Sequence, residues 1–204
     1  MTSVPVASPD DAAALAVALT EHGACRLPGF TDEAATGRLR EALQLSQSAG
    51  GFHPAQVGHG DAQGLHAGIR GDSTAWIDGH SGPAATAYLA ALESLRLQLN
   101  QRLFLGMQEV EAHFACYPPG SRYRRHRDRF HDSDARVLSF VTYLNRDWQR
   151  QEGGALRLYL SQGAVDVLPQ DALTVCFLSS IEHEVLPATR ERLSIAAWMR
   201  TLAR

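Results

Sequence analysis

Apolar residues in the first half of the chain recur at the spacing that is typical of helices. Three segments show this spacing, and the last of them carries a broad stripe of leucines. Residues that can cap a helix stand before the first two segments, and a glycine follows the first. The predicted helices run from a cap at Ser8 or Asp10 through Leu19 to Gly23, from the cap Thr31 over Asp32 to about Ser48, and from about Ala84 to Phe104.

The second half alternates between apolar and polar residues, which indicates strands. From Val110 to Tyr117, one face carries Phe114 and Cys116, whereas the other carries His113 and Tyr117. Turns rich in Gly and Pro separate the candidate strands, and no helical segment lies between them. Short strands in this order predict an antiparallel sandwich or small barrel. The further candidates are Val137–Leu144, Ala155–Leu160, Leu173–Leu178 and Leu193–Met199.

An irregular stretch from Gly50 to Gly68 interrupts the helical half. It is rich in Gly, His and Gln and shows no periodicity. Connections of this length are uncommon inside a compact chain unless they serve a function or are disordered. We therefore expect a functional loop or a disordered segment here.

Membrane and secretion signals are missing from the pattern. No window is long and apolar enough to span a bilayer, and the first residues lack the regions of a signal peptide. The three cysteines, Cys25, Cys116 and Cys176, are odd in number and far apart, so we expect buried thiols and neither disulfides nor a thiolate zinc site. We predict a cytoplasmic protein with no membrane partner.

Composition narrows the possible chemistry. The 204 residues are 45% hydrophobic and include 19 basic and 22 acidic residues, for a formal net charge of −3. This length suits a single domain, and this charge does not favour nucleic acid as a partner. All 19 basic residues are arginine, which excludes Schiff-base chemistry and the phosphate-binding lysines of P-loop proteins and kinases.

One spacing selects among the nine histidines. His126 and Asp128 are two residues apart, so on extended chain their side chains point the same way. His183 is a third candidate, because it stands at the start of the last predicted hairpin. Two imidazoles and one carboxylate on one face of a six-coordinate metal leave three positions open, which is typical of non-haem Fe(II) oxygenases.

An arginine that could bind a carboxylate follows His183 in the sequence. Arg192 lies nine residues after His183 and begins the last predicted strand. Its guanidinium could bind the distal carboxylate of a dicarboxylate that chelates the iron at its other end. Arg190 shares the same face of the strand, so spacing alone leaves both arginines open.

Longer stretches resemble a known family, the Fe(II)/2-oxoglutarate oxygenases. Within that family the likeness is greatest to the hypoxia-inducible-factor-type prolyl hydroxylases and their bacterial relatives, over about residues 69–200. The matching sequence segments are Ile69–Asp72 with Trp76-Ile77, Ala115–Pro118, Tyr123 before His126, Tyr143–Trp148, Gly153–Arg157, His183–Val185, and Arg192 with Trp198.

The resemblance implies an α+β fold, with an all-β double-stranded β-helix (jelly-roll) core and supporting N-terminal helices. One domain would span residues 1–204, with helical support and a mobile loop at about 54–68 in residues 1–105, and the jelly-roll core in 106–204. It also implies that His126, Asp128 and His183 hold Fe(II). The cosubstrate carboxylate would bind Arg192, which the family register prefers to Arg190, together with Tyr143, while Tyr117 lies near it.

The resemblance further implies the reaction. A prolyl residue of a protein would be hydroxylated with O₂, while 2-oxoglutarate is decarboxylated to succinate and CO₂, with ascorbate (vitamin C) as an optional reductant. The target would be a protein such as a translation factor or a ribosomal protein. Alternatives are a hydroxylase of a free amino acid or other small molecule, and a catalytically silent jelly-roll binding module. A nucleic-acid demethylase is disfavoured because Trp198 stands where such enzymes carry a second arginine.

Two further expectations concern the substrate side, to which the family likeness assigns Arg70, Asp72, Arg136, Tyr123 and Trp198. Asp72 and Arg136 match family positions that pair, so we expect a salt bridge between them. Arg122–Arg129 contains five arginines in eight residues, which is more than the family requires. This cluster could be a solvated rim, a site for an acidic stretch of a protein substrate, or a nucleic-acid contact.

Overall fold

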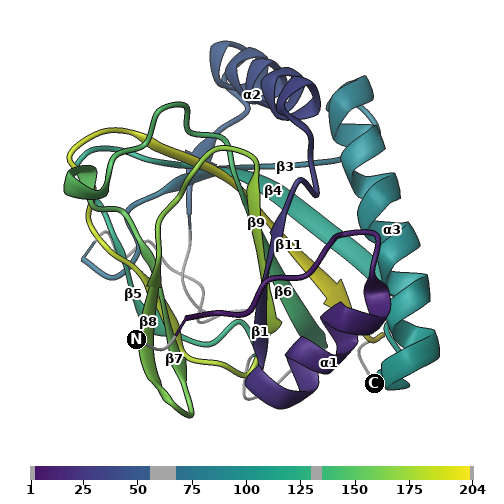
Figure 1. Cartoon of the computed structure of the whole chain (residues 1–204). Helices are drawn as coiled ribbons and strands as arrows, with labels where there is room; N and C mark the ends of the chain where they lie inside the picture. The colour runs from purple at the N-terminus through teal and green to yellow at the C-terminus, as the bar shows by residue number, and fades with distance from the viewer. Residues whose placement is uncertain (1–2, 56–67, 130–134, 203–204) are drawn as a thin grey trace.

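Two antiparallel sheets face each other, and helices cover the outer side of the larger sheet (Figure 1). The computed structural model describes residues 3–55, 68–129 and 135–202. The helices are α1 (Ala12–His22), α2 (Glu33–Ser48) and α3 (Pro83–Leu103). The strands are β1 (Ala24–Pro28), β2 (His53–Pro54), β3 (Ser73–Trp76), β4 (Glu109–Tyr117), β5 (Tyr123–His126), β6 (Arg136–Tyr143), β7 (Leu156–Leu160), β8 (Gly163–Val167), β9 (Leu173–Leu178), β10 (His183–Val185) and β11 (Arg192–Arg200), with a 3₁₀ turn at Arg150–Glu152.

Strand order explains how distant residues meet. In the described part of the chain, the larger sheet has the order β1-β9-β6-β11-β4-β3-β2 and the smaller sheet β5-β10-β7-β8. β11, the last strand, lies between β4 and β6, which come much earlier in the chain. The predicted all-β core with supporting helices and the double-stranded β-helix are confirmed.

Strand β11 shows why the two faces of the larger sheet differ. Leu193, Ile195 and Met199 point toward the helices and belong to the core between helices and sheet. Since side chains alternate along a strand, Arg192 and Trp198 point to the other face, toward the smaller sheet. The molecule thus has an apolar layer under the helices and a second space between the sheets. That second space is apolar at one end, where Phe177 and Leu158 are fully buried.

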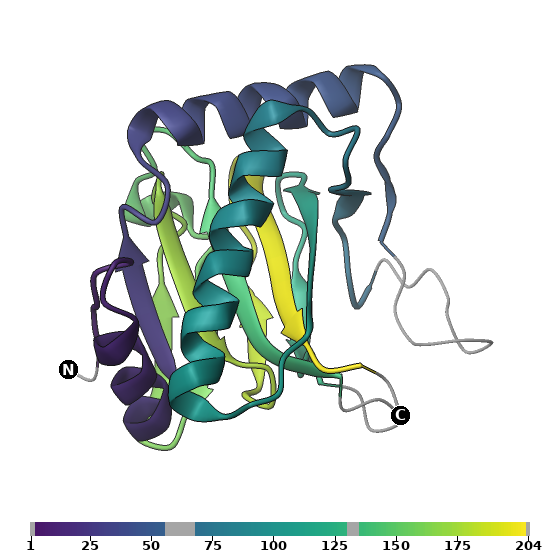
Figure 2. The same cartoon turned by 90° about the vertical axis from the view of Figure 1, so that its right-hand side faces the viewer.

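The helices end close to the predicted bounds. Asp11 caps α1 by accepting from the backbone N–H groups of Ala13 and Ala14, and Gly23 ends it in the left-handed conformation. Asp32 caps α2, one residue after the predicted cap. The dark blue α2 lies across one end of the sheet in Figure 2, and the teal α3 runs along its face. None of the described helices is both long and apolar enough to cross a bilayer.

The five predicted strands form, within about a residue at each end, but several short strands were missed. β5 has the sequence Tyr-Arg-Arg-His and shows no apolar alternation. Its backbone is extended because it pairs with β10 on one side and bridges Arg70 on the other. The three cysteines are free and buried, as expected. The predicted mobile loop at 54–68 lies mostly outside the described residues.

Neighbouring leucines of α3 allow a matched test of the helix–sheet core. Leu99 is fully buried, whereas 52% of Leu97 is exposed. Leu99→Ala should lower the free energy of unfolding by about 2–5 kcal/mol, because it removes buried methyl groups and leaves a cavity. Leu97→Ala should change it by no more than about 0.5 kcal/mol. Urea denaturation followed by circular dichroism measures both, and equal effects would contradict this assignment of the core.

Candidate active site

His126, Asp128 and His183 meet between the two sheets, at the end where the polar residues lie. The three potential ligand atoms lie within 4.8 Å of one another. The Nε2 atoms of His126 and His183 are each 3.6 Å from a different oxygen of Asp128. The register pairs His183 of β10 directly with His126 of β5, which brings together two side chains that are far apart in sequence.

Hydrogen bonds orient both imidazoles for metal binding. Nδ1 of His126 is 2.7 Å from the carbonyl oxygen of Arg124, and Nδ1 of His183 is 3.0 Å from that of Ile181. A carbonyl oxygen can only accept, so each Nδ1 carries the proton and each Nε2 keeps a free lone pair. This is the outer contact that metal-binding histidines commonly make.

Asp128 is held from behind by a serine pair that the sequence analysis missed. The Ser139 hydroxyl donates to Oδ2 of Asp128 at 2.7 Å, and Ser179 lies 2.8 Å from the Ser139 hydroxyl. Ser139 and Tyr143 occupy alternate positions of β6, so they share a face of the strand. That periodicity was a signal that could have found Ser139, whereas Ser179 lies in a turn and carried none.

The protonation states suit a cation. Burial opposes the charge of Asp128, yet His183, His126 and a nearby arginine hold the pKa of its carboxyl well below the ordinary value. Burial lowers the pKa of the His183 imidazole to about 4, although Asp128 opposes this shift. At neutral pH the site therefore presents an ionised carboxylate and a neutral imidazole, which are the forms that bind a metal.

A second polar pocket surrounds Arg192, which is only 1% exposed. Its Nε donates to the carbonyl oxygen of Gly154 at 3.0 Å, and its Nη1 donates to the Ser194 hydroxyl at 3.2 Å. Gly154 has φ +70°, and a Cβ there would lie 2.8 Å from the Trp148 ring and 3.5 Å from Cδ of Arg192. Only glycine fits this position, where the backbone fixes the guanidinium. The sequence analysis placed Gly154 in a turn and in the family-like segment Gly153–Arg157, but predicted no role for it.

Unpaired polar atoms show what this pocket lacks. Within the described part of the chain, Nη2 of Arg192 and the Tyr143 hydroxyl are buried without a hydrogen-bond partner. Buried donors are normally satisfied, so two orphans together mark a place for an acceptor. Burial raises the pKa of Tyr143 to about 12, with Arg192 opposing the shift, so the hydroxyl keeps its proton. A guanidinium N–H and a phenol O–H fit a carboxylate.

Two tyrosines join the Arg192 pocket to the three-residue metal set. The Arg192 guanidinium lies 5.2 Å from the centre of the Tyr117 ring, and Tyr123 packs against the cluster that contains Tyr117. The Tyr123 ring in turn stacks on His126, with ring centres 3.5 Å apart. Arg70 lies over the outer side of Tyr123, at 4.7 Å from its ring centre. A continuous chain of side-chain contacts therefore links Arg192 to His126 and Arg70.

Trp198 lies on the same face of β11 as Arg192 and packs against residues from β3 and β4. It lies opposite Ser139 in the strand register, and its ring contacts those of His113 and Trp76. Burial lowers the pKa of His113 to about 4, so this imidazole is neutral and packs as an aromatic ring. The Arg136 guanidinium stacks on Trp198 at 3.6 Å.

The expected salt bridge between Asp72 and Arg136 is wrong in this structure. Asp72 accepts a bidentate pair of hydrogen bonds from Arg70, at 2.8 and 3.0 Å. Arg136 instead donates to Glu111 of β4 at 2.7 Å. Asp72 is 4% exposed and Arg70 is its neighbour on the same segment, so the local pair satisfies the buried carboxylate. Family likeness at two positions did not reveal this competing partner.

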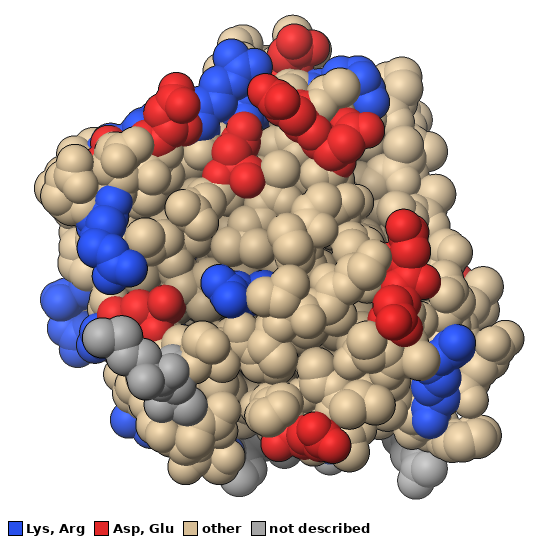
Figure 3. All heavy atoms as spheres, viewed as in Figure 1, with Lys and Arg blue, Asp and Glu red and all other residues tan. Residues whose placement is uncertain are grey.

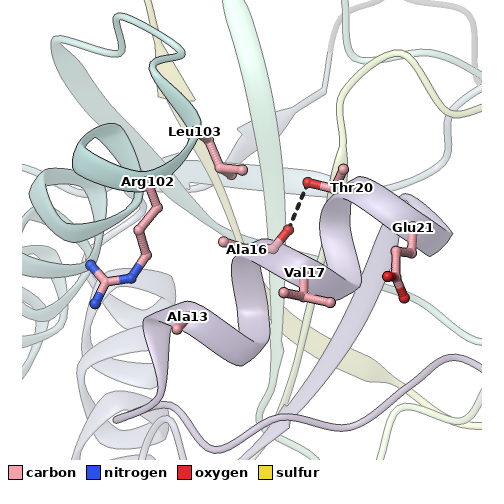
Figure 4. Close-up of a pocket in the computed structure, with 7 residues that line it drawn as sticks. All are labelled: Ala13, Ala16, Val17, Thr20, Glu21, Arg102 and Leu103. Carbon is pink, nitrogen blue, oxygen red and sulfur yellow. Dashed lines mark hydrogen bonds between the residues drawn. The ribbon is translucent and has the colours of Figure 1, made fainter.

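A cavity of about 380 Å³ between α1 and α3 is a weaker candidate. Its wall is formed by small and apolar side chains such as Ala16, Val17 and Leu103 (Figure 4). Its charged residues, Glu21 and Arg102, lie at opposite ends of the view, and the Thr20 hydroxyl donates within α1. No set of convergent polar groups forms here, so the site between the sheets is the functional candidate.

Comparison with known proteins supports this choice. Residues 112–200 match the family model described as the 2OG-Fe(II) oxygenase superfamily. The human protein "Prolyl hydroxylase EGLN3" is 30% identical over 190 residues, which cover 88% of this chain and 79% of that protein. Human "Egl nine homolog 1" is 28% identical over 192 residues, but the match covers only 44% of its length.

Solved structures agree with the sequence comparison. A prolyl-4-hydroxylase from Pseudomonas putida is 42% identical, with a TM-score of 0.86 and coverage of 94% of this chain and 100% of that one. A Trichoplax adhaerens prolyl hydroxylase, solved with a peptide from hypoxia inducible factor, is 28% identical, with a TM-score of 0.85 and coverage of 94% and 90%. The chain thus belongs to the 2OG-Fe(II) oxygenase superfamily, in the branch that contains these prolyl hydroxylases.

Proposed function

We propose that this protein hydroxylates a prolyl residue of a protein substrate, with Fe(II), 2-oxoglutarate and O₂, and releases succinate and CO₂. The observation that carries the proposal is the pair of unpaired buried donors at Arg192 and Tyr143, which side-chain contacts through Tyr117 and Tyr123 link to an oriented two-histidine, one-carboxylate set. The likeness to prolyl hydroxylases supports proline as the target.

Each residue has a role in this proposal. His126, Asp128 and His183 would hold the iron, whose open positions leave room for the other reactants. Arg192 and Tyr143 would bind the distal carboxylate of 2-oxoglutarate, and the iron with its cosubstrate supplies the oxidising chemistry. Tyr117 and Trp198, which are buried, and Tyr123, which is partly buried, would orient the reactants and exclude water. Ascorbate would act as an optional reductant.

Charge favours a protein over a nucleic acid as substrate. The net charge is −3, and acidic and basic side chains are interspersed around the face shown in Figure 3.

A translation factor or ribosomal protein is the first target class to examine. When whole lysate protein is incubated with this protein, Fe(II) and 2-oxoglutarate in air, mass spectrometry should find one peptide with an added oxygen on proline. Hydroxylation of free proline alone would instead support the small-molecule alternative.

Loss of a metal ligand should abolish iron binding. Under anaerobic conditions, Fe(II) and 2-oxoglutarate together should give a visible charge-transfer band with the unaltered protein. His183→Ala should weaken Fe(II) binding by more than the roughly 10–100-fold that loss of an outer partner costs. His22→Ala, on the exposed side of α1, serves as the control and should keep the band. A silent binding module would show no band in any variant.

The open choice between Arg190 and Arg192 can be decided by kinetics. Arg192→Gln leaves a carboxylate without its buried cation, which costs about 2 kcal/mol or more, so KM for 2-oxoglutarate should rise about 30-fold or more. Tyr143→Phe removes one hydrogen bond to that charge and should raise KM about 10-fold.

Arg190→Gln is the matched control for these kinetics. Arg190 is half-exposed at the surface, where it contacts Glu152 at 3.3 Å. Its loss should change KM for 2-oxoglutarate by less than about twofold, because exposed ion pairs contribute little. A large effect of Arg190→Gln together with a small effect of Arg192→Gln would reverse the assignment.

A further inference from the structure

Eight of the described arginines are paired with a carboxylate. Carboxylates hold the side chains at 40, 70, 96, 125, 136, 157, 190 and 200, each within 4.0 Å. The exceptions that are exposed remain open to an anionic group of another molecule. Three of the exposed exceptions, Arg122, Arg124 and Arg127, lie on or beside one short strand, β5. No ion pair joins them to any residue that the structure describes.

The position of these three arginines relative to the metal set is defined by β5. Tyr123 and His126 point inward, where they stack on each other. The register shifts between Tyr123 and His126, so the two residues between them, Arg124 and Arg125, are both exposed. Arg127 stands between two candidate ligands. At about 3.3 Å per residue, every arginine of this group lies within a few residue lengths of the metal set.

Two described acidic groups beside this rim, Glu182 and Glu184, already have partners. Glu182 hydrogen-bonds Arg125, which holds the pKa of the Glu182 carboxyl low, and Arg127 adds to the effect. Glu184 accepts from the Tyr159 hydroxyl and lies 3.9 Å from Arg157. Among the residues that the structure describes, the rim at residues 122–127 therefore has an excess of positive charge, on a protein whose net charge is negative.

Backbone pairing at this edge is closed, so side chains are what a partner would meet. The Gly71 N–H donates to the carbonyl oxygen of Arg122, and the Arg124 N–H donates to that of Ile69. A substrate segment cannot add a strand there through these groups. The exposed guanidiniums remain available, and each offers a planar fork of donors that matches a carboxylate.

We propose that Arg122, Arg124 and Arg127 bind an acidic segment, rich in Asp or Glu, beside the target proline of the substrate protein. This inference rests on the proposed function for the target residue, whereas the charge preference can be measured by binding alone. A protein segment fits better than nucleic acid, because Tyr123, the aromatic residue of this strand, is already stacked between His126 and Arg70.

The test measures binding of fluorescein-labelled peptides by anisotropy, with the protein loaded with Fe(II) and 2-oxoglutarate without oxygen. One peptide carries proline beside four Glu or Asp residues, and its match carries Gln and Asn instead. The acidic peptide should bind about 10-fold more tightly at low salt, and the difference should shrink as salt is added. The triple variant R122Q/R124Q/R127Q should remove most of this preference, and R124Q alone should remove part of it.

A triple variant with the same loss of charge provides the control. R38Q/R102Q/R150Q changes three exposed arginines that have no carboxylate partner among the described residues and lie on or beside other elements. It should keep the preference for the acidic peptide. Equal affinity for both peptides, or equal loss in both triple variants, would overturn the proposal. Tighter binding of a single-stranded RNA of similar charge at the same arginines would also overturn it.

Hydroxylation is read separately from binding. Mass spectrometry of the neutral proline peptide after incubation with O₂ reports on the proposed function. A charge preference without hydroxylation would refute prolyl hydroxylation of such peptides and leave the acidic-segment proposal standing. Hydroxylation without a charge preference would support prolyl hydroxylation and overturn the acidic-segment proposal.

Discussion

The register between β5 and β10 is the constraint on which the candidate site depends. It places His126 opposite His183, and Asp128 follows two residues later. A slip of one residue would turn every side chain of either strand to the other face of the sheet. The strands are short and largely polar, so the register is held by their surroundings: β7 on one side and the segment around Arg70 on the other. The metal set is therefore a product of sheet assembly.

A buried arginine imposes the second constraint. An isolated charge in a protein interior is costly unless it is paired and hydrogen-bonded. Arg192 donates hydrogen bonds to the Gly154 carbonyl oxygen and the Ser194 hydroxyl, whereas its Nη2 and the Tyr143 hydroxyl have no hydrogen-bond partner among the described residues. These fixed bonds orient the guanidinium before any ligand arrives, so a carboxylate would bind without reorganising the pocket. The same pocket explains a glycine of positive φ at position 154, where a side chain would collide with Trp148.

The use of arginine as the sole basic residue connects these sites with the surface. Inside the fold, arginines bind carbonyl oxygens, serine and aromatic faces, as Arg192 and Arg136 do. On the outside many of them pair with carboxylates, whereas Arg122, Arg124 and Arg127 cluster on or beside one short strand without a carboxylate partner among the described residues. A guanidinium stays charged at every physiological pH, so none of these contacts depends on titration of the cation.

From local periodicity, the sequence by itself predicted the three helices and five of the strands. From the two-residue spacing of His126 and Asp128 and from family likeness, it named the residues of the candidate metal set. It also named Arg192 and Tyr143 for the second pocket. It could not show β5 as a strand, since Tyr-Arg-Arg-His has no hydrophobic alternation, and β10, with three residues, is too short to show one. Nor could it find Ser139 behind Asp128 or the Arg70–Asp72 pair in place of Asp72–Arg136. Which of these contacts form is decided only when the two sheets pack together and bring distant residues next to each other. Local sequence patterns do not show which distant residues become neighbours.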